Sequence, residues 1–195
     1  MENIVHGLLR GTGAAINVPI GFIPDLVIVT NLTDGNKITI GHPSMYLCAF
    51  TSGGTSEVKK GMLLTGNTSG ATGRVAGVIL DTGSWAGGDA AGWIIIDPVS
   101  IVGTFAGETA YIPGGSNDIT LSAALESPNV DIDTEVADAT GNAAISAYLG
   151  SSTSGSEAAK GFTVGSTVST DAKLLSFVAM RGGPGSAGKD VYNSA

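Results

Sequence analysis

Short apolar runs separated by turn residues recur along the whole chain, and their pattern is that of β-strands. The run 26-LVIVTNL-32 is nearly continuous and rich in β-branched residues, which is typical of a core strand. Asp34-Gly35 follows it and is the signal for a tight hairpin turn, so 37-KITI-40 is predicted to be the return strand. Further strands are expected in 3–20, on either side of a turn, and in 44-SMYLCAF-50. The first fifty residues therefore predict an antiparallel meander or part of a sandwich.

The Gly-punctuated run 61–112 predicts four or five short strands joined by tight turns. No helix of useful length can start there, because Gly interrupts every window that could propagate one. The polar stretch 51–60 before it is interpreted as a flexible linker.

After Ile112 the pattern loosens. The stretches ITLSAAL and AAISAYL fit either a strand or a short helical turn, whereas VDIDTEV alternates as a half-buried strand does. Residues 151–159 predict an exposed, mobile loop, and 160–181 predict two more strands. The tail has no pattern of its own and is interpreted as an arm that orders only against a partner.

These patterns predict an all-β protein with a β-sandwich or jelly-roll-like body and an additional Gly-rich β-module, a small barrel or sheet. The predicted divisions are N-terminal strands of the body in 1–60, the module in 61–114, the remaining strands and loops of the body in 115–181, and a flexible C-terminal arm in 182–195.

Composition supports this class and narrows the function. Among 195 residues, 30 are Gly and only 13% are charged, a profile common in all-β proteins with many tight turns. The net charge of −8, with nine Lys and Arg in total, disfavours binding to nucleic acid or to a membrane surface. A single cysteine, Cys48, excludes an intramolecular disulfide and is interpreted as a small buried hydrophobe. The first residues lack the features of a signal peptide, and no apolar run reaches membrane-spanning length.

The sharpest catalytic motif is Asp81-Thr82-Gly83 after an apolar run, as in aspartic proteases. That chemistry needs two aspartates sharing a proton, and no second such motif exists, so only a homodimeric enzyme fits. The segment 101–103 would then cross behind the aspartate. The alternative is an ordinary turn between two strands, and we interpret the chain as no enzyme.

No metal or cofactor site is predicted. His6, His42 and Cys48 have no zinc-binding spacing. Asp131, Asp133 and Glu135 alternate on one strand face, which a calcium site or a solvated face could explain, and we favour the solvated face.

Several stretches resemble structural proteins of tailed-phage virions. They are GFIPDLVIVTNLTDGNKI, a later SMYL, TSGATGRV…GWIIIDPVSIVGTFAGETAYI, and the closing KGFTVGS…LLSFVAMR. Within that family the chain is most similar to head decoration (cement) proteins, with tail, baseplate or fibre proteins that contact host glycans as the alternative. The resemblance implies synthesis in the host bacterial cytoplasm and a place on the capsid surface, bound to the major capsid protein.

Exposed sheet edges favour self-association as a homo-oligomer, a trimer more than a dimer. The chain ends and one aromatic loop are expected to touch partners. The predicted contact residues are Trp85, Met1, Ile4, Val191 and Tyr192. Trp93, in contrast, is predicted to be a core residue.

Overall fold

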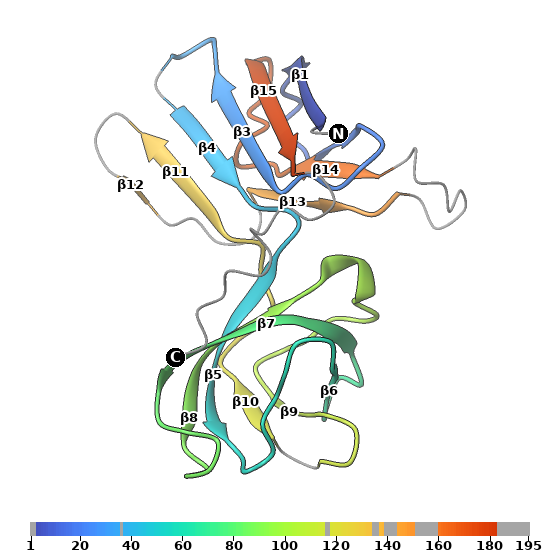
Figure 1. Cartoon of the computed structure of the whole chain (residues 1–195). Coiled ribbons are helices and arrows are strands. Elements are labelled where there is room, and N and C mark those ends of the chain that lie inside the picture. The colour runs from blue at the N-terminus through green and yellow to red at the C-terminus, as the bar shows by residue number, and fades with distance from the viewer. Residues whose placement is uncertain are drawn as a thin grey trace. The chain divides into compact units, whose positions relative to one another are not determined.

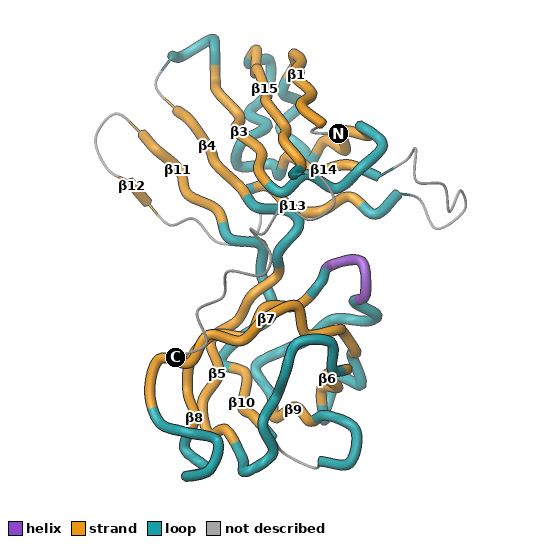
Figure 2. The backbone as a smooth tube through the Cα atoms, viewed as in Figure 1, coloured by secondary structure: helices purple, strands orange, loops and turns teal. Residues whose placement is uncertain are grey.

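The computed structural model describes residues 3–35, 37–115, 118–133, 137–138, 144–150 and 160–182. This described part is all-β, as predicted, and its only helical element is the 3₁₀ turn η1 (Pro98–Ser100) (Figure 2). No helix within these ranges has the length and apolar character needed to cross a bilayer. The chain divides into two units: a sandwich unit within Met1–Ser44 and Ser127–Ser186, and a barrel unit, Met45–Glu126, inserted between them in the sequence.

The sandwich unit contains two antiparallel sheets (Figure 1). The six-stranded sheet has the order β1-β15-β3-β4-β11-β12 and the smaller one the order β13-β14-β2. The strands are β1 (Asn3–Arg10), β2 (Ile16–Pro19), β3 (Leu26–Asn31), β4 (Lys37–Gly41), β11 (Asn129–Asp133), β12 (Ala137–Asp138), β13 (Ile145–Tyr148), β14 (Gly161–Val164) and β15 (Leu174–Arg181).

The core of this unit lies between the two sheets. Val27 and Val29 of β3 and Leu175 of β15 pack in one buried cluster with residues of β13 and β14. Phe162 of β14 meets Phe177 of β15 edge to face, with ring centroids 5.3 Å apart. Alternate residues of each strand enter this core because side chains in a strand point to opposite faces in turn. The body is therefore a sandwich.

The predicted hairpin of β3 and β4 is confirmed. Gly35 has a φ of +68°, a conformation that Gly adopts without strain. The side chain of Asn31 accepts hydrogen bonds from the backbone N–H groups of Thr33 and Asp34, which closes the turn. Local residues alone therefore determine this part of the fold.

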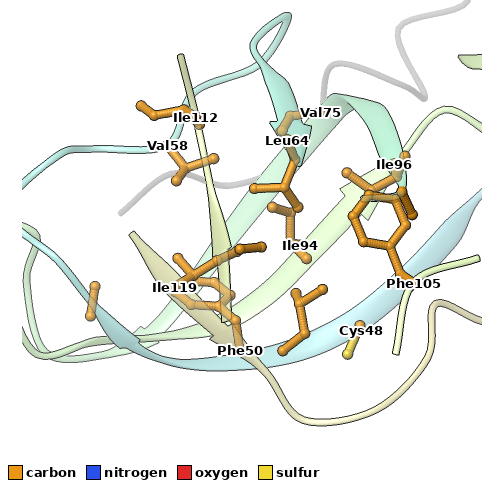
Figure 3. Close-up of a cluster of buried hydrophobic side chains, with 14 residues drawn as sticks. Cys48, Phe50, Val58, Leu64, Val75, Ile94, Ile96, Phe105, Ile112 and Ile119 are labelled. Atoms are coloured by element: carbon orange, nitrogen blue, oxygen red, sulfur yellow. The ribbon is translucent and has the colours of Figure 1, made fainter. Parts of the chain in front are cut away.

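The barrel unit is closed, with the strand order β10-β5-β8-β7-β6-β9. Its elements are β5 (Tyr46–Gly53), β6 (Leu63–Gly66), β7 (Thr72–Thr82), β8 (Ala90–Ile96), η1, β9 (Thr109–Tyr111) and β10 (Ile119–Leu121). Figure 3 shows its core, in which Phe50, Leu64, Ile94 and Ile119 are at most 1% exposed. The predicted small Gly-rich module is thus a barrel.

The barrel is larger than the predicted module 61–114. Strand β5, expected in the body, pairs with β8 and β10 instead. Val58 is 2% exposed within the barrel core, so the polar stretch 51–60 is not a linker. Alternation identifies a strand but carries no information on which sheet accepts it, and this accounts for the difference.

Other segments also differ in detail. The expected strand around 99–103 is η1, capped by Asp97, followed by an isolated bridge between Val102 and Thr72. The ambiguous stretches after Ile112 form strands β10 and β13. The loop 151–159 and the arm beyond Gly182 lie outside the described residues.

Candidate protein-interaction surface

One side of the six-stranded sheet faces away from the sandwich core. We call it the outer face and define it by the outward-pointing residues of five strands. These are Ile4, His6, Leu8 and Arg10 of β1; Leu174, Ser176, Val178 and Met180 of β15; Leu26, Ile28 and Thr30 of β3; Ile38 and Ile40 of β4; and Val130 and Ile132 of β11. Apart from His6, Arg10, Thr30 and Ser176, all of them are apolar.

The strand register aligns these residues in rows across the sheet. One row runs from His6 through Val178, Ile28 and Ile40 to Val130. The next runs from Leu8 through Ser176, Thr30 and Ile38 to Ile132. Directly paired side chains in antiparallel strands lie about 5 Å apart, so Val178, Ile28, Ile40 and Val130 form a continuous apolar strip, whereas Ser176 and Thr30 interrupt the second row.

Several of these side chains are well exposed. Leu8 is 65% exposed, Ile4 60%, and Val130 and Ile132 43% each. Scattered exposed hydrophobic residues are normal on a soluble protein, but a contiguous apolar patch marks an interaction site. The patch therefore qualifies as a protein-binding surface.

The β4–β11 pair supports this assignment, because its apolar side chains point outwards and its polar side chains point towards the core. Ile40 and Val130 face outwards, while the inward residues Thr39, Asn129 and Asp131 are polar and buried. Asn129 is held by hydrogen bonds from its amide to Ser127 and from the backbone N–H of Ile145. A slip of one residue in register would exchange the two faces, so the observed pairing keeps apolar residues on the outside.

Asp131 is a carboxylate on the inward, buried side of β11, and it is paired with a lysine. Its carboxylate is 2.9 Å from Lys37 Nζ, in an ion pair whose geometry falls short of a hydrogen bond. It is therefore a buried, paired side chain and not part of the solvated strand face that we expected. The side chains of Asp133 and Glu135 lie outside the described residues.

Of the predicted contact residues, Ile4 lies on the outer face. Trp85 is only partly exposed and stacks on Phe50, with ring centroids 5.6 Å apart and planes 11° from parallel. Met1, Val191 and Tyr192 lie outside the described residues. Trp93 is 41% exposed, so the prediction of a core residue was wrong. Its neighbours Ile94 and Ile96 point into the barrel, and alternation turns Trp93 outwards.

A polar cluster in the barrel joins two stretches of one Gly-rich motif, 66–73 and 103–108. Glu108 accepts hydrogen bonds from the Thr68 and Ser69 backbone N–H groups, from the Ser69 hydroxyl at 2.5 Å, and from the Ala106 N–H. Burial by itself raises the pKa of Glu108, but these donors outweigh it and lower the pKa below its ordinary value. The ionised carboxylate therefore holds the turn between β6 and β7 in place, and we call Glu108 with its hydrogen-bond donors the Glu108 clamp.

The glycines of the same motif allow this close approach. A Cβ on Gly66 would lie 2.5 Å from a carboxylate oxygen of Glu108, and one on Gly73 would lie 2.6 Å from Ile96. Gly103 has a φ of +80° and packs on Ala71. The motif therefore encodes a tightly packed turn, a role that sequence reasoning missed because its two halves are far apart in the chain.

The residues of the predicted protease motif are arranged differently from expectation. Asp81 is exposed near the end of β7, before a turn in which the Ser84 N–H donates to Asp89. Val102 pairs with Thr72 at the opposite end of β7, so 101–103 does not cross behind Asp81.

The candidate metal ligands are divided between the two units, with His6 and His42 in the sandwich unit and Cys48 in the barrel unit. His6 is on the outer face, whereas Cys48 is buried in the barrel core, as predicted. Within the described ranges, no group of three or more His, Cys, Asp or Glu residues is placed to hold a metal ion.

Comparisons with protein-family models, with curated proteins and with solved structures found no match to this chain.

Proposed function

We propose that this chain is a structural protein of a tailed-phage virion, a decoration protein that binds the assembled head and stabilises it across subunit seams. The observation that carries the proposal is the outer face, a largely apolar surface on a six-stranded sheet. A face of this kind is stabilised when another protein of an assembly covers it, either the shell or a second copy of the chain. The resemblance of the Gly-rich segments to phage structural proteins supplies the class of assembly.

The mechanism is passive and depends on buried area. Complete burial of one exposed Leu or Ile side chain contributes about 1.5–3 kcal/mol, so several such residues suffice for a stable contact. A standard interface buries about 1,600 Å² in total. Many copies bound to one shell, each bridging neighbouring subunits, add their contributions through avidity.

The two units suit a protein that must keep its shape. The barrel is closed by β9 and β10 and has no open sheet edge within its ladder. The Glu108 carboxylate accepts three hydrogen bonds from the turn between β6 and β7 and a fourth from the Ala106 N–H. A closed barrel of this kind holds its own surface residues in a defined geometry, which repeated binding to a symmetric shell requires.

Immunogold labelling of phage particles purified from the host that produces this chain tests the proposal. We expect antibody against the chain to label heads, at many sites per particle. Label confined to tails or fibres would overturn the decoration assignment and support the tail alternative. Particles without label on any part would overturn the virion assignment altogether.

A further inference from the structure

We propose that the outer face packs against the same face of a second copy of this chain, so that two six-stranded sheets meet face to face in a dimer. The inference rests on the proposed function, because it names a partner for the outer face, the surface from which that function is argued. Contacts with the shell then fall to other surfaces of the dimer.

The charge distribution of the outer face favours a second copy over a partner of different sequence. Selective interfaces between different proteins are usually matched through complementary charges. The outer face, as defined above, contains no acidic residue, and its only Arg or Lys is Arg10 on the edge strand β1. Two such faces can meet without burying an unpaired carboxylate. The net charge of −8 is therefore carried outside this surface.

The composition is also that of a permanent homodimer interface. Such interfaces are more apolar than those of transient complexes and resemble a protein core cut in two. The outward apolar residues of β4 and β11 also fit a homodimer interface, since Ile38, Ile40 and Val130 are directed away from the core of their own unit. They would enter a core only when a second apolar layer covers them.

The available area reaches the minimum expected for a specific dimer contact. Five strands at about 4.8 Å spacing, each contributing about six residues of 3.3 Å, give a face of about 500 Å². Two such faces bury about 1,000 Å² in total, which reaches the lower limit for a specific interface.

The geometry favours two copies over the trimer expected from the sequence. A single flat face that covers an identical face forms an isologous contact, and a two-fold axis closes it completely. A third copy would find no outer face left to cover. Stacked sheets lie about 10 Å apart, which Ile, Leu and Val side chains from both sides fill.

Sedimentation equilibrium of the full chain, in the absence of any phage particle, tests this inference separately from the proposed function. Val178→Glu and Val130→Glu place a carboxylate in the outer face at positions that are 37% and 43% exposed. We expect wild-type protein to sediment as two copies, and each variant to raise the dimer Kd by at least about thirtyfold.

Val102→Glu is the matched control. Val102 is 70% exposed and belongs to the barrel unit, whereas the outer face belongs to the sandwich unit, and its variant should dimerise like the wild type. Circular dichroism checks that each variant keeps the wild-type strand content. A single-copy or three-copy mass for the wild type overturns the inference. So does a dimer that both face variants leave unchanged, or one that the control weakens equally.

Discussion

The Ser69 hydroxyl donates a 2.5 Å hydrogen bond to the carboxylate of Glu108, and this contact joins two stretches of the barrel that are 39 residues apart. Ser69 also accepts a hydrogen bond from the backbone N–H of Ala71, so one hydroxyl connects the turn to the clamp. Both stretches belong to the Gly-rich segment 61–112, and they meet at this point. The hydrogen bonds between these stretches stabilise the turn between β6 and β7, so their role is structural. The candidate interaction surface is the outer face of the other unit.

Replacement of Glu108 by Gln should destabilise the chain. The variant keeps the size of the side chain but loses the charge, and its NH₂ group faces backbone donors that need an acceptor. Hydrogen bonds to charged groups contribute about 1.5–3 kcal/mol each, so we expect a loss of at least about 2 kcal/mol in the free energy of unfolding. Urea denaturation at neutral pH measures it. Glu57→Gln is the control, because Glu57 forms only an exposed ion pair with Lys59 and should change stability by less than about 0.5 kcal/mol.

The contribution of Glu108 should depend on pH in a defined direction. Its folded-state pKa is lower than the ordinary value of 4.5, so the folded protein binds this proton less readily than the unfolded chain. The stabilisation is therefore fully present above about pH 4.5 and is lost as the pH falls through the folded-state pKa. The difference in unfolding free energy between wild type and Glu108→Gln should shrink below that pH. A difference that stays constant down to about pH 3 would contradict the lowered pKa.

Ser69→Ala should weaken the same clamp. It removes the hydroxyl that donates to Glu108 and accepts from Ala71, at an expected loss of about 1–2 kcal/mol. Combined with Glu108→Gln, it should have less than an additive effect, because both substitutions remove one shared interaction. A double-mutant cycle measures this coupling. Fully additive losses would show that the two side chains act independently.

The two tryptophans should differ in their importance for stability. Trp85 stacks on Phe50 and packs against the barrel core, so Trp85→Ala should lower the free energy of unfolding by about 2–4 kcal/mol. Trp93 is 41% exposed, and Trp93→Phe should change it by less than about 1 kcal/mol. Fluorescence of the single-Trp variants provides a second readout. The emission of Trp85 should lie at shorter wavelength than that of Trp93, and the reverse order would contradict the observed packing.

Salt should not weaken the proposed dimer. The outer face contains no acidic residue, so we expect no ion pairs between two such faces, and the net charge of −8 on each copy repels the other at low ionic strength. Added NaCl screens this repulsion, so the dimer Kd should stay constant or fall as salt rises from about 0.05 to 0.5 M. Sedimentation equilibrium across this series measures the trend. A Kd that rises steeply with salt would indicate an interface built on charge, contrary to the apolar contact.

Local sequence signals predicted the parts of the fold that neighbouring residues control. Asp34-Gly35 between two β-branched runs determines the hairpin of β3 and β4, because the required backbone conformation is local. The Gly-rich run likewise excluded helix and predicted a small β-module. The assignment of β5 to the barrel was not predictable in this way, since its partners β8 and β10 lie about 40 and 70 residues further along the chain.

The sequence by itself determined the class of the protein: strand-length apolar runs, abundant Gly and few charges permit little other than an all-β fold. Only the tertiary structure decided which side of each strand is buried. The alternation of KITIG favours its isoleucines for the core, but pairing with β3 aligns Ile40 with Ile28 and turns both outwards. Strand register is a contact between distant residues, and one step in it exchanges core for surface. The outer face exists for that reason, and no single strand reveals it.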